Sequence, residues 1–307
     1  MRNSEATAAL AAQFGERLLI DEPLARHTSA RIGGPADAFL AAQTIDDLRE
    51  AARIAWSHEL PLTLLGGGSN VLISDEGIRG LVLRNQSDWH EIDGNQVRVA
   101  SGVNSIRLAR TLANQGLAGF EWAIGVPGSI GGALYGNAGA HGSDMAANVL
   151  SAEVAIPHED EGLKTKVWSN EELAFDYRSS VIKRERRRCV ILAVTFGFEP
   201  DAPEEIHARM EEYNAYRKRT QPPGATLGSM FKNPPGDYAG RLIDAAGLKG
   251  FRIGGAQISE KHANFFLNSE EASAGEIKAL IDYAASRVYD QFGVHLKLEI
   301  ELLGDWG

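Results

Sequence analysis

The feature that most restricts how this chain can fold is a concentration of glycine between positions 125 and 142. Seven glycines fall within these 18 positions, which begin Gly125-Val126-Pro127-Gly128-Ser129-Ile130-Gly131-Gly132 and continue to Gly139 and Gly142. Glycine lacks a Cβ, so its backbone amides can turn toward a ligand and approach a phosphate or a flat ring closely. The segment is also apolar, which weakens the alternative of a merely flexible or tightly turned loop. It therefore predicts a ligand-binding loop.

A second glycine cluster, Gly66-Gly67-Gly68-Ser69-Asn70, follows a predicted strand at residues 61–65. Ser69 and Asn70 add side-chain donors suited to a pyrophosphate. Taken alone, the cluster is explained equally well by the steric needs of a tight turn. Neither glycine segment has the complete G-x-G-x-x-G pattern, and G-x-x-x-x-G-K-[ST] is absent from the sequence. Together the two segments predict a dinucleotide cradle that is not of the Rossmann type.

Composition limits the class of protein. The 307 residues suit two or three domains, and 44% hydrophobic with 23% charged residues is typical of a globular chain. A formal net charge of −10 disfavours nucleic acid as a partner, because phosphate contacts need an excess of Lys and Arg. The one basic run, residues 183–188, precedes the apolar stretch 189–194, and we expect it to form a solvated hairpin turn.

The single cysteine, Cys189, excludes disulfides within the chain and a cysteine-based metal site, and we expect no metal site. Glu5 stands where a signal peptide needs an apolar core, and no window approaches the ~20 apolar residues that span a bilayer. We therefore expect a cytoplasmic protein that is not bound to a membrane.

Capping residues mark the predicted helices. Thr44 and Asp47 have capping spacing before a helix that ends ahead of Pro61, and another helix covers residues 105–114. Ser273 and Glu276 form the same kind of pair before an amphipathic helix that ends at Gly293.

The segment after Gly293 alternates apolar and polar residues from 294 to 302, which predicts a strand with one buried face. Glu299 lies on its polar face. A long polar helix is expected at about 204–219, after a proline-containing link at 199–203. We place the main domain boundary at this link, with residues 1–199 (subdomains of about 1–85 and 86–199) before it and 200–307 after it.

Six segments in order, 27–36, 66–70, 125–142, 175–180, 228–234 and 293–299, resemble one known family. The first three look like the FAD-binding half of the UDP-N-acetylenolpyruvoylglucosamine reductases, and the last three resemble that family's three catalytic segments. The likeness covers about residues 20–304. It implies an α+β fold with a vanillyl-alcohol oxidase-type (PCMH-like) FAD-binding region of two α+β subdomains and a C-terminal α+β substrate-binding domain.

The resemblance implies a function and a set of residues. The reaction would be FAD-dependent reduction of UDP-N-acetylglucosamine enolpyruvate to UDP-N-acetylmuramate, with NADPH as hydride source, by a cytoplasmic monomer that serves peptidoglycan synthesis, cell wall biogenesis, cell shape and cell division. Catalysis would use Arg178, Ser229 and Glu299. The FAD-binding residues would be Gly66, Gly67, Gly68, Ser69, Asn70, Gly125, Val126, Pro127, Gly128, Ser129, Gly131, Gly132 and Gly139.

Each catalytic residue type suits reduction of an enolpyruvyl ether. After hydride reaches the methylene carbon, negative charge develops toward the carboxylate-bearing carbon, where Arg178 and a protonated Glu299 can stabilise it. Ser229 would protonate that carbon, provided that neighbouring donors make its alkoxide less costly. Taken singly, Arg178 also fits a surface ion pair, Ser229 a glycine-flanked turn and Glu299 a solvated strand face.

For the sugar nucleotide, the resemblance points to Asn233 and His262, and to Arg217 for the diphosphate, although ordinary loop structure also explains these residues. Arg178 and Ser229 are 51 positions apart, which is similar to the short class of the family and leaves little room for the tyrosine-bearing loop of the long class. Two other readings stay open. The chain could be another flavin oxidoreductase or oxidase of the same fold, or a non-catalytic protein that binds flavin or a sugar nucleotide.

Overall fold

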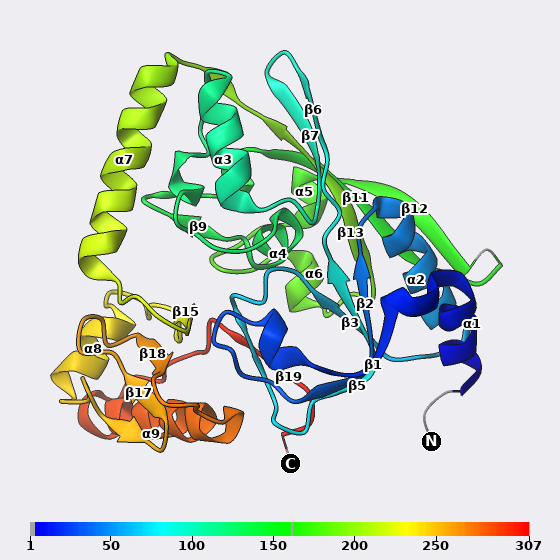
Figure 1. Ribbon diagram of the computed structural model, residues 1–307. Coiled ribbons are helices and arrows are strands. Elements are labelled where there is room, and N and C mark those ends of the chain that lie inside the picture. The colour runs from blue at the N-terminus through cyan, green and yellow to red at the C-terminus, as the bar shows by residue number, and fades with distance from the viewer. Residues whose placement is uncertain (1–3, 161, 307) are drawn as a thin grey trace. The chain divides into compact units, whose positions relative to one another are not determined.

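The computed structural model describes residues 4–160 and 162–306 (Figure 1). The chain forms two compact units, each built from separate stretches of sequence. Unit 1 contains the residues up to 20 together with 37–67 and 80–215, and unit 2 contains 21–36, 68–79 and 216–307. The units therefore interleave along the chain, whereas the division expected at residue 199 separates continuous segments.

Unit 1 is built largely around an antiparallel five-stranded sheet in the order β12-β11-β13-β7-β6 and a four-stranded sheet in the order β1-β2-β5-β3. The strands of the first are β6 (His90–Asp93), β7 (Gln96–Ala100), β11 (Val149–His158), β12 (Gly162–Ser169) and β13 (Val190–Gly197). Those of the second are β1 (Leu18–Pro23), β2 (Pro35–Ala42), β3 (Leu62–Leu65) and β5 (Ile78–Asn85). Two small pairs join β9 (Gly139–Ala140) to β10 (Ser143–Asp144) and β8 (Leu117–Ala118) to β14 (Glu199–Pro200).

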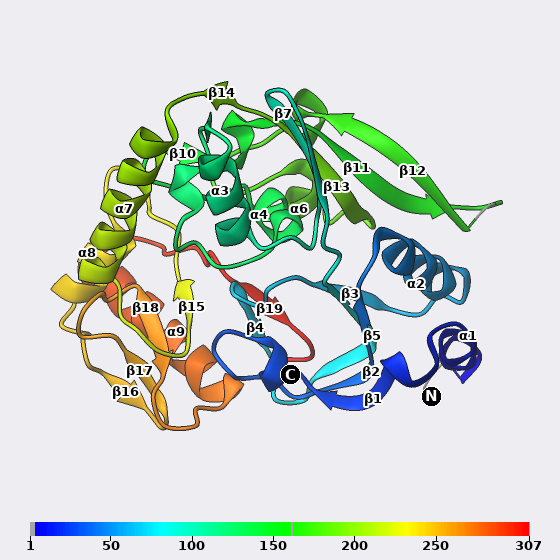
Figure 2. The ribbon, with the colours of Figure 1, turned by 45° about the horizontal axis from the view of Figure 1, so that its top comes forward.

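Unit 1 also contains helices. They are α1 (Ser4–Phe14), α2 (Ile45–Ser57), α3 (Ser105–Asn114), α4 (Ile130–Gly136), α5 (Asn170–Leu173), α6 (Val181–Arg184) and the first part of α7 (Pro203–Thr220), which continues into unit 2. Of these, α2, α4 and α5 contact strands of the two larger sheets. Strand β13 shows why its sequence is a continuous apolar run. Val190 and Leu192 pack in the core that α1 and α2 share, while Val194 and Phe196 pack in the core beneath α3 and α4. Both faces of this strand are therefore buried, and Figure 2 shows α2 beside the edge of the sheet at β12.

Unit 2 contains an antiparallel sheet in the order β15-β18-β17-β16 and a parallel pair of β4 and β19. The strands are β4 (Val71–Ile73), β15 (Thr226–Ser229), β16 (Arg252–Ile253), β17 (Ala256–Ile258), β18 (Phe265–Asn268) and β19 (Glu301–Leu303). The helices α8 (Ala239–Ala245) and α9 (Ala274–Phe292) pack on this sheet around one apolar core. None of the helices in residues 4–160 and 162–306 has the length and apolar character needed to cross a bilayer.

The predicted capping residues are confirmed. Thr44 accepts a hydrogen bond from the Asp47 amide at the start of α2, and the Asp47 carboxylate bonds back to the Thr44 amide. Ser273 and Glu276 make the same reciprocal pair at α9. Gly293 ends α9 with φ +68°, a conformation that favours glycine.

Two sequence expectations are wrong. Residues 294–302 are not one strand, because only Glu301–Leu303 forms β19 and Leu298 makes an isolated bridge to Phe231. Burial follows the expected alternation only from Val294 to Leu298, because Glu299 and Glu301 are half-buried like their apolar neighbours. The basic run 183–188 is not a hairpin turn. It begins in the last turn of α6 and continues as a loop into β13, because the preceding Ser180 caps a helix by accepting a hydrogen bond from the Lys183 amide.

Candidate active site

The two predicted glycine segments meet inside unit 1. A Cβ placed on Gly66 would overlap the hydroxyl oxygen of Ser129, and a Cβ on Gly67 would lie 2.9 Å from the Cα of Gly128. Carbon atoms in contact are normally about 3.5–4.0 Å apart, so the backbones approach this closely only because Gly66 and Gly67 lack a Cβ. The structure thus shows two loops with little side-chain volume lying against each other.

The second segment is anchored by hydrogen bonds to the protein itself. The amide of Ile130 donates to Val103 O (2.9 Å), that of Gly131 donates to Ser101 O (2.7 Å), and that of Gly132 reaches Ser129 Oγ (3.4 Å). The Gly131 and Gly132 amides therefore have protein acceptors. Their direct contact with a cofactor stays a prediction, as it does for the other glycines.

Several other predicted cofactor residues lie in or beside turns with the positive φ that glycine favours. Gly125 has φ +76° and Gly128 has φ +136° on either side of Val126 and Pro127. In unit 2, Gly68 has φ +63°, and a Cβ there would overlap the carbonyl oxygen of His27. Ser69 is half-buried beside it.

Arg178 occupies a tight turn in unit 1. Asp176 and Ser179 exchange both backbone hydrogen bonds across it, at 2.9 and 3.0 Å. Arg178 itself has φ +54°, which is uncommon for a residue with a side chain and is found more often at functional sites. Its Nη2 donates to Gly139 O at 2.7 Å, and the guanidinium lies 5.3 Å from the Tyr177 ring. The turn and these contacts hold the guanidinium near the second glycine segment.

Ser229 and Glu299 come together in unit 2. Ser229 ends strand β15 opposite Phe265, and the next residue, Met230, accepts a hydrogen bond from the Glu299 amide at 2.9 Å. Glu299 is half-buried in a bend, whereas Lys297 before it is exposed. It is therefore not a residue of the solvated strand face that the alternation suggested.

Two asparagines fix this pair of segments. Asn264 is 3% exposed; its side chain accepts from the Phe231 amide (2.9 Å) and donates to Phe231 O (2.8 Å). Asn70 donates from Nδ2 to Glu299 O at 3.1 Å, and its carbonyl accepts from the Glu301 amide at 2.9 Å. Sequence reasoning missed Asn264, although it lies two residues after His262. It assigned Asn70 to the cofactor alone.

The predicted substrate residues have local structural roles. Asn233 Oδ1 accepts from the Ala239 amide at the start of α8 (3.1 Å), and His262 Nδ1 accepts from the Asn264 amide (3.2 Å). Burial lowers the pKa of His262, and the nearby charge of Lys249 acts in the same direction. Burial also lowers the pKa of the Arg217 guanidinium.

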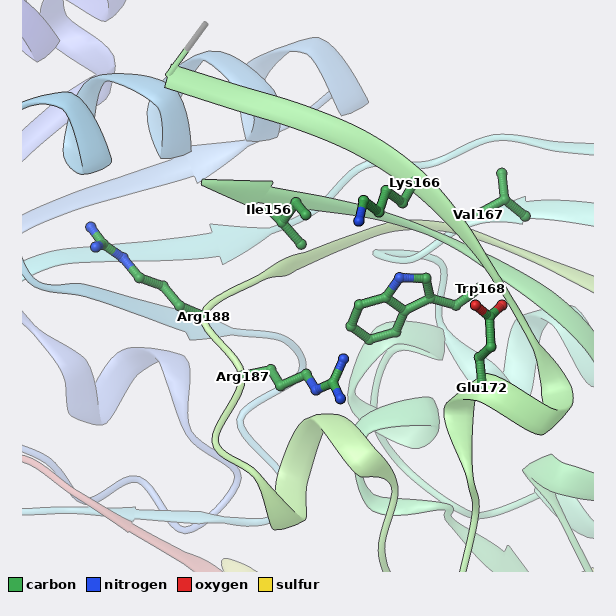
Figure 3. A pocket seen from close by; sticks show the side chains of 7 residues that line it. All are labelled: Ile156, Lys166, Val167, Trp168, Glu172, Arg187 and Arg188. Atoms are coloured by element: carbon green, nitrogen blue, oxygen red, sulfur yellow. The ribbon is translucent and has the colours of Figure 1, made fainter. Parts of the chain in front are cut away.

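A pocket of about 600 Å³ lies elsewhere in unit 1 (Figure 3). Its lining contains none of the predicted site residues; it consists of Ile156, Lys166, Val167, Trp168, Glu172, Arg187 and Arg188. The guanidinium of Arg187 lies 5.1 Å from the Trp168 ring and also pairs with Glu185, at 2.6 Å. This pocket is therefore not the predicted active site.

Within residues 4–160 and 162–306, no group of three or more His, Cys, Asp or Glu side chains could hold a metal ion.

Comparison with known proteins gives two family matches. Residues 36–160 match the FAD binding domain family, and residues 220–303 match the family described as UDP-N-acetylenolpyruvoylglucosamine reductase, C-terminal domain. A UDP-N-acetylenolpyruvoylglucosamine reductase from Bacillus velezensis is 42% identical over 94% of this chain and 94% of its own length. One from Chloroflexus aggregans is 43% identical over 92% of this chain and 96% of its own length.

Solved structures agree with these matches. The UDP-N-acetylenolpyruvylglucosamine reductase of Thermus caldophilus has a TM-score of 0.78 and 34% identity, over 94% of this chain and 98% of that protein. A glucose oxidase variant of Phl p 4 has a TM-score of 0.50 and 13% identity, over 65% of this chain and 44% of that protein. The second likeness concerns the fold alone.

Proposed function

This chain belongs to the UDP-N-acetylenolpyruvoylglucosamine reductase family, and we propose that Arg178, Ser229 and Glu299 are its catalytic residues. It is an FAD-dependent oxidoreductase that reduces UDP-N-acetylglucosamine enolpyruvate with NADPH in peptidoglycan synthesis. The observation that carries the residue assignment is the hydrogen bond from the Glu299 amide to Met230 O, which places the Glu299 segment next to Ser229. Arg178 belongs to unit 1, so its convergence with the other two residues is part of the proposal.

The glycine segments fit a flavin dinucleotide. Gly66 and Gly67 lie so close to Gly128 and Ser129 that a Cβ would separate the two loops. A flat ring and a diphosphate bind to such loops through backbone groups and need little side-chain volume. When bound, FAD would supply the hydride that originates from NADPH. We propose that these loops, with Gly125, form the cradle.

The three catalytic residues would then have distinct tasks. Arg178, held by Gly139 O, would bind the enolpyruvyl carboxylate and stabilise the charge that develops there. A protonated Glu299 would share that charge. Ser229 would deliver a proton to the carbon that bears the carboxylate. Within the described residues no group is hydrogen-bonded to the Ser229 hydroxyl, so the donors that would lower the cost of its alkoxide belong to the proposal as well.

Three further residues would hold the sugar nucleotide. Arg217 has no carboxylate partner in the part of the chain that the structure describes, and burial lowers the pKa of its guanidinium. A half-buried cation without a counter-charge suits an anionic ligand, and we assign it to the diphosphate. Asn233 and His262 would contact the nucleotide or the sugar while keeping their local hydrogen bonds.

The reaction also indicates where the enzyme works and which cellular processes it serves. We propose that the enzyme works as a cytoplasmic monomer and so serves cell wall biogenesis, cell shape and cell division. We keep the expected division into an FAD-binding region before residue 200 and a substrate-binding region after it, although the compact units interleave.

An oxidase with covalently attached flavin is less well supported. Cys189, the only cysteine, is half-buried, and burial raises its pKa to about 11, which leaves little nucleophilic thiolate.

Anaerobic stopped-flow spectroscopy tests the proposal in two steps. NADPH should reduce the bound FAD, and UDP-N-acetylglucosamine enolpyruvate should then reoxidise it; failure of the second step contradicts the activity. In Ser229→Ala, reduction should keep its wild-type rate, while reoxidation should fall at least 100-fold, as expected for loss of a proton donor. The matched control is Ser269→Ala, in which an exposed serine bonded to Gln257 is removed from the same unit. Normal reoxidation in Ser229→Ala would remove Ser229 from the mechanism.

A further inference from the structure

The carbonyl that holds Arg178 belongs to a very small hairpin. Gly139 and Ala140 form strand β9, which pairs with Ser143 and Asp144 of β10. The connecting residues His141 and Gly142 have φ +53° and +83°, so both adopt the positive φ of a two-residue turn. A two-stranded hairpin is marginally stable on its own. The position of Gly139 O therefore depends on what the hairpin contacts: Ala140 packs against the core of unit 1, and the base and the tip make further contacts.

At its base, the hairpin is tied to the turn that carries Arg178. The side chain of Asn137 is 2% exposed; Nδ2 donates to Asp144 Oδ2 and to Asp176 O, each at 3.0 Å. Asp176 begins the turn of Arg178. These bonds fix one end of the hairpin and leave the tip to be held by another contact.

At its tip, the ring of His141 stacks on Tyr213 of α7. The ring centroids are 4.1 Å apart and the planes differ by 8°. Met210 lies four residues after Ile206 and Tyr213 three residues after Met210, so the three side chains share one face of α7. Ile206 is 1% and Met210 5% exposed in the core of unit 1, and Tyr213 packs against the same core. The tip therefore rests on a rigid surface.

We propose that the stack of His141 on Tyr213 is a positioning device for Arg178: it holds the β9–β10 hairpin in place, and Gly139 O then holds the guanidinium. In this role both rings act on the guanidinium through the hairpin. The importance of the stack for turnover rests on the role proposed above for Arg178. The effect of the stack on the order of the Arg178 side chain is independent of that catalytic role.

Two variants remove the stack from opposite sides. His141→Gly deletes the ring and leaves a residue that adopts positive φ freely, so folding of the turn is not at risk. Tyr213→Ala deletes the other ring, and Tyr213→Phe keeps a ring of the same shape and should restore the wild-type behaviour. The control is Tyr283→Ala, which removes a comparable stack in unit 2, on Phe251 with centroids 4.6 Å apart.

The first readout is independent of activity. In protein labelled with 15N-arginine, the Nε–Hε signal of Arg178 is identified by its absence in Arg178→Lys. We expect an ordered signal in the wild type, Tyr213→Phe and Tyr283→Ala, and an order parameter below about 0.6 in His141→Gly and Tyr213→Ala. An Arg178 signal that keeps its wild-type order in both of these variants overturns the proposal.

The second readout is the reoxidation of reduced flavin by the enolpyruvyl substrate. His141→Gly and Tyr213→Ala should slow it about tenfold, because small displacements of a catalytic group are costly. In the Arg178→Lys background, Tyr213→Ala should add less than twofold, since the stack then has no guanidinium to position. A full tenfold effect in that background overturns the proposal. If Arg178→Lys itself leaves reoxidation unchanged, the catalytic role of Arg178 fails, while the order measurement still decides the positioning role.

Discussion

Replacement of Gly67 by alanine tests whether the close approach of the two glycine segments serves flavin binding. The new Cβ would lie 2.9 Å from the Cα of Gly128, about 0.6–1.1 Å closer than carbon atoms pack in protein interiors. The apoprotein can relieve the overlap if the two loops move apart. Binding of FAD would then have to bring them together again.

The cost of closing the loops against an extra methyl group is about 1–3 kcal/mol, the usual range for overpacking. Since 1.4 kcal/mol corresponds to a factor of ten, the affinity of Gly67→Ala for FAD should fall by about 5- to 150-fold. Titration of apoprotein with FAD, followed by quenching of flavin fluorescence, measures this directly. The matched control is Gly136→Ala at the end of α4, where a Cβ meets no atom within 4 Å, and FAD affinity should stay within about twofold.

Two results would refute this reasoning. If Gly67→Ala binds FAD as tightly as the wild type, the close approach of the segments is not needed for the cofactor. If Gly136→Ala weakens binding as much as Gly67→Ala, the effect is a general response to a methyl group and not to the contact with Gly128.

Two further predictions concern individual side chains. The carboxylate of Asp75 accepts hydrogen bonds from the first two amides of α9 at 2.8 and 2.9 Å, so Asp75→Ala should lower the free energy of unfolding by about 1–2 kcal/mol. Thermal unfolding should show a lower Tm, and an unchanged Tm would contradict the assigned role. Burial raises the pKa of Cys189 to about 11, so the folded protein keeps the thiol protonated at pH values where the unfolded chain has lost the proton. At pH 8.5 iodoacetamide should therefore alkylate native protein about 100-fold more slowly than urea-unfolded protein, with a rate that still rises above pH 10; equal rates would show that the thiol is not shielded.

Features that depend on neighbouring residues could be predicted from the sequence. The helix starts at Thr44 and Ser273 are examples, because a cap and its partner three residues later are both local. The sequence also predicted that the two glycine segments form one cradle, but it did not indicate their direct backbone contact. The resemblance supplied the family and the flavin, which composition alone did not.

Features that depend on distant partners could not be predicted. The alternation predicted burial correctly only up to residue 298, since Glu299 and Glu301 are half-buried. The backbone bonds of residues 297 and 299 go to Lys232 and Met230, and only the end of the segment pairs with a strand, β4. The loop at 185–189 follows a helix whose cap, Ser180, had been assigned to the catalytic segment. The contact of His141 with Tyr213 joins residues 72 positions apart, and nothing in either local sequence indicates it.

The interleaving of the two units restricts how the protein can be divided in the laboratory. A recombinant fragment that starts near residue 216 would lack β4, to which β19 pairs through Glu301 and Val71. It would also lack Asp75 at the start of α9 and the apolar residues Ile32 and Leu72 of the same core. Such a fragment should be insoluble or unfolded when expressed by itself. Screening of substrate analogues against this part of the enzyme therefore requires the full-length chain.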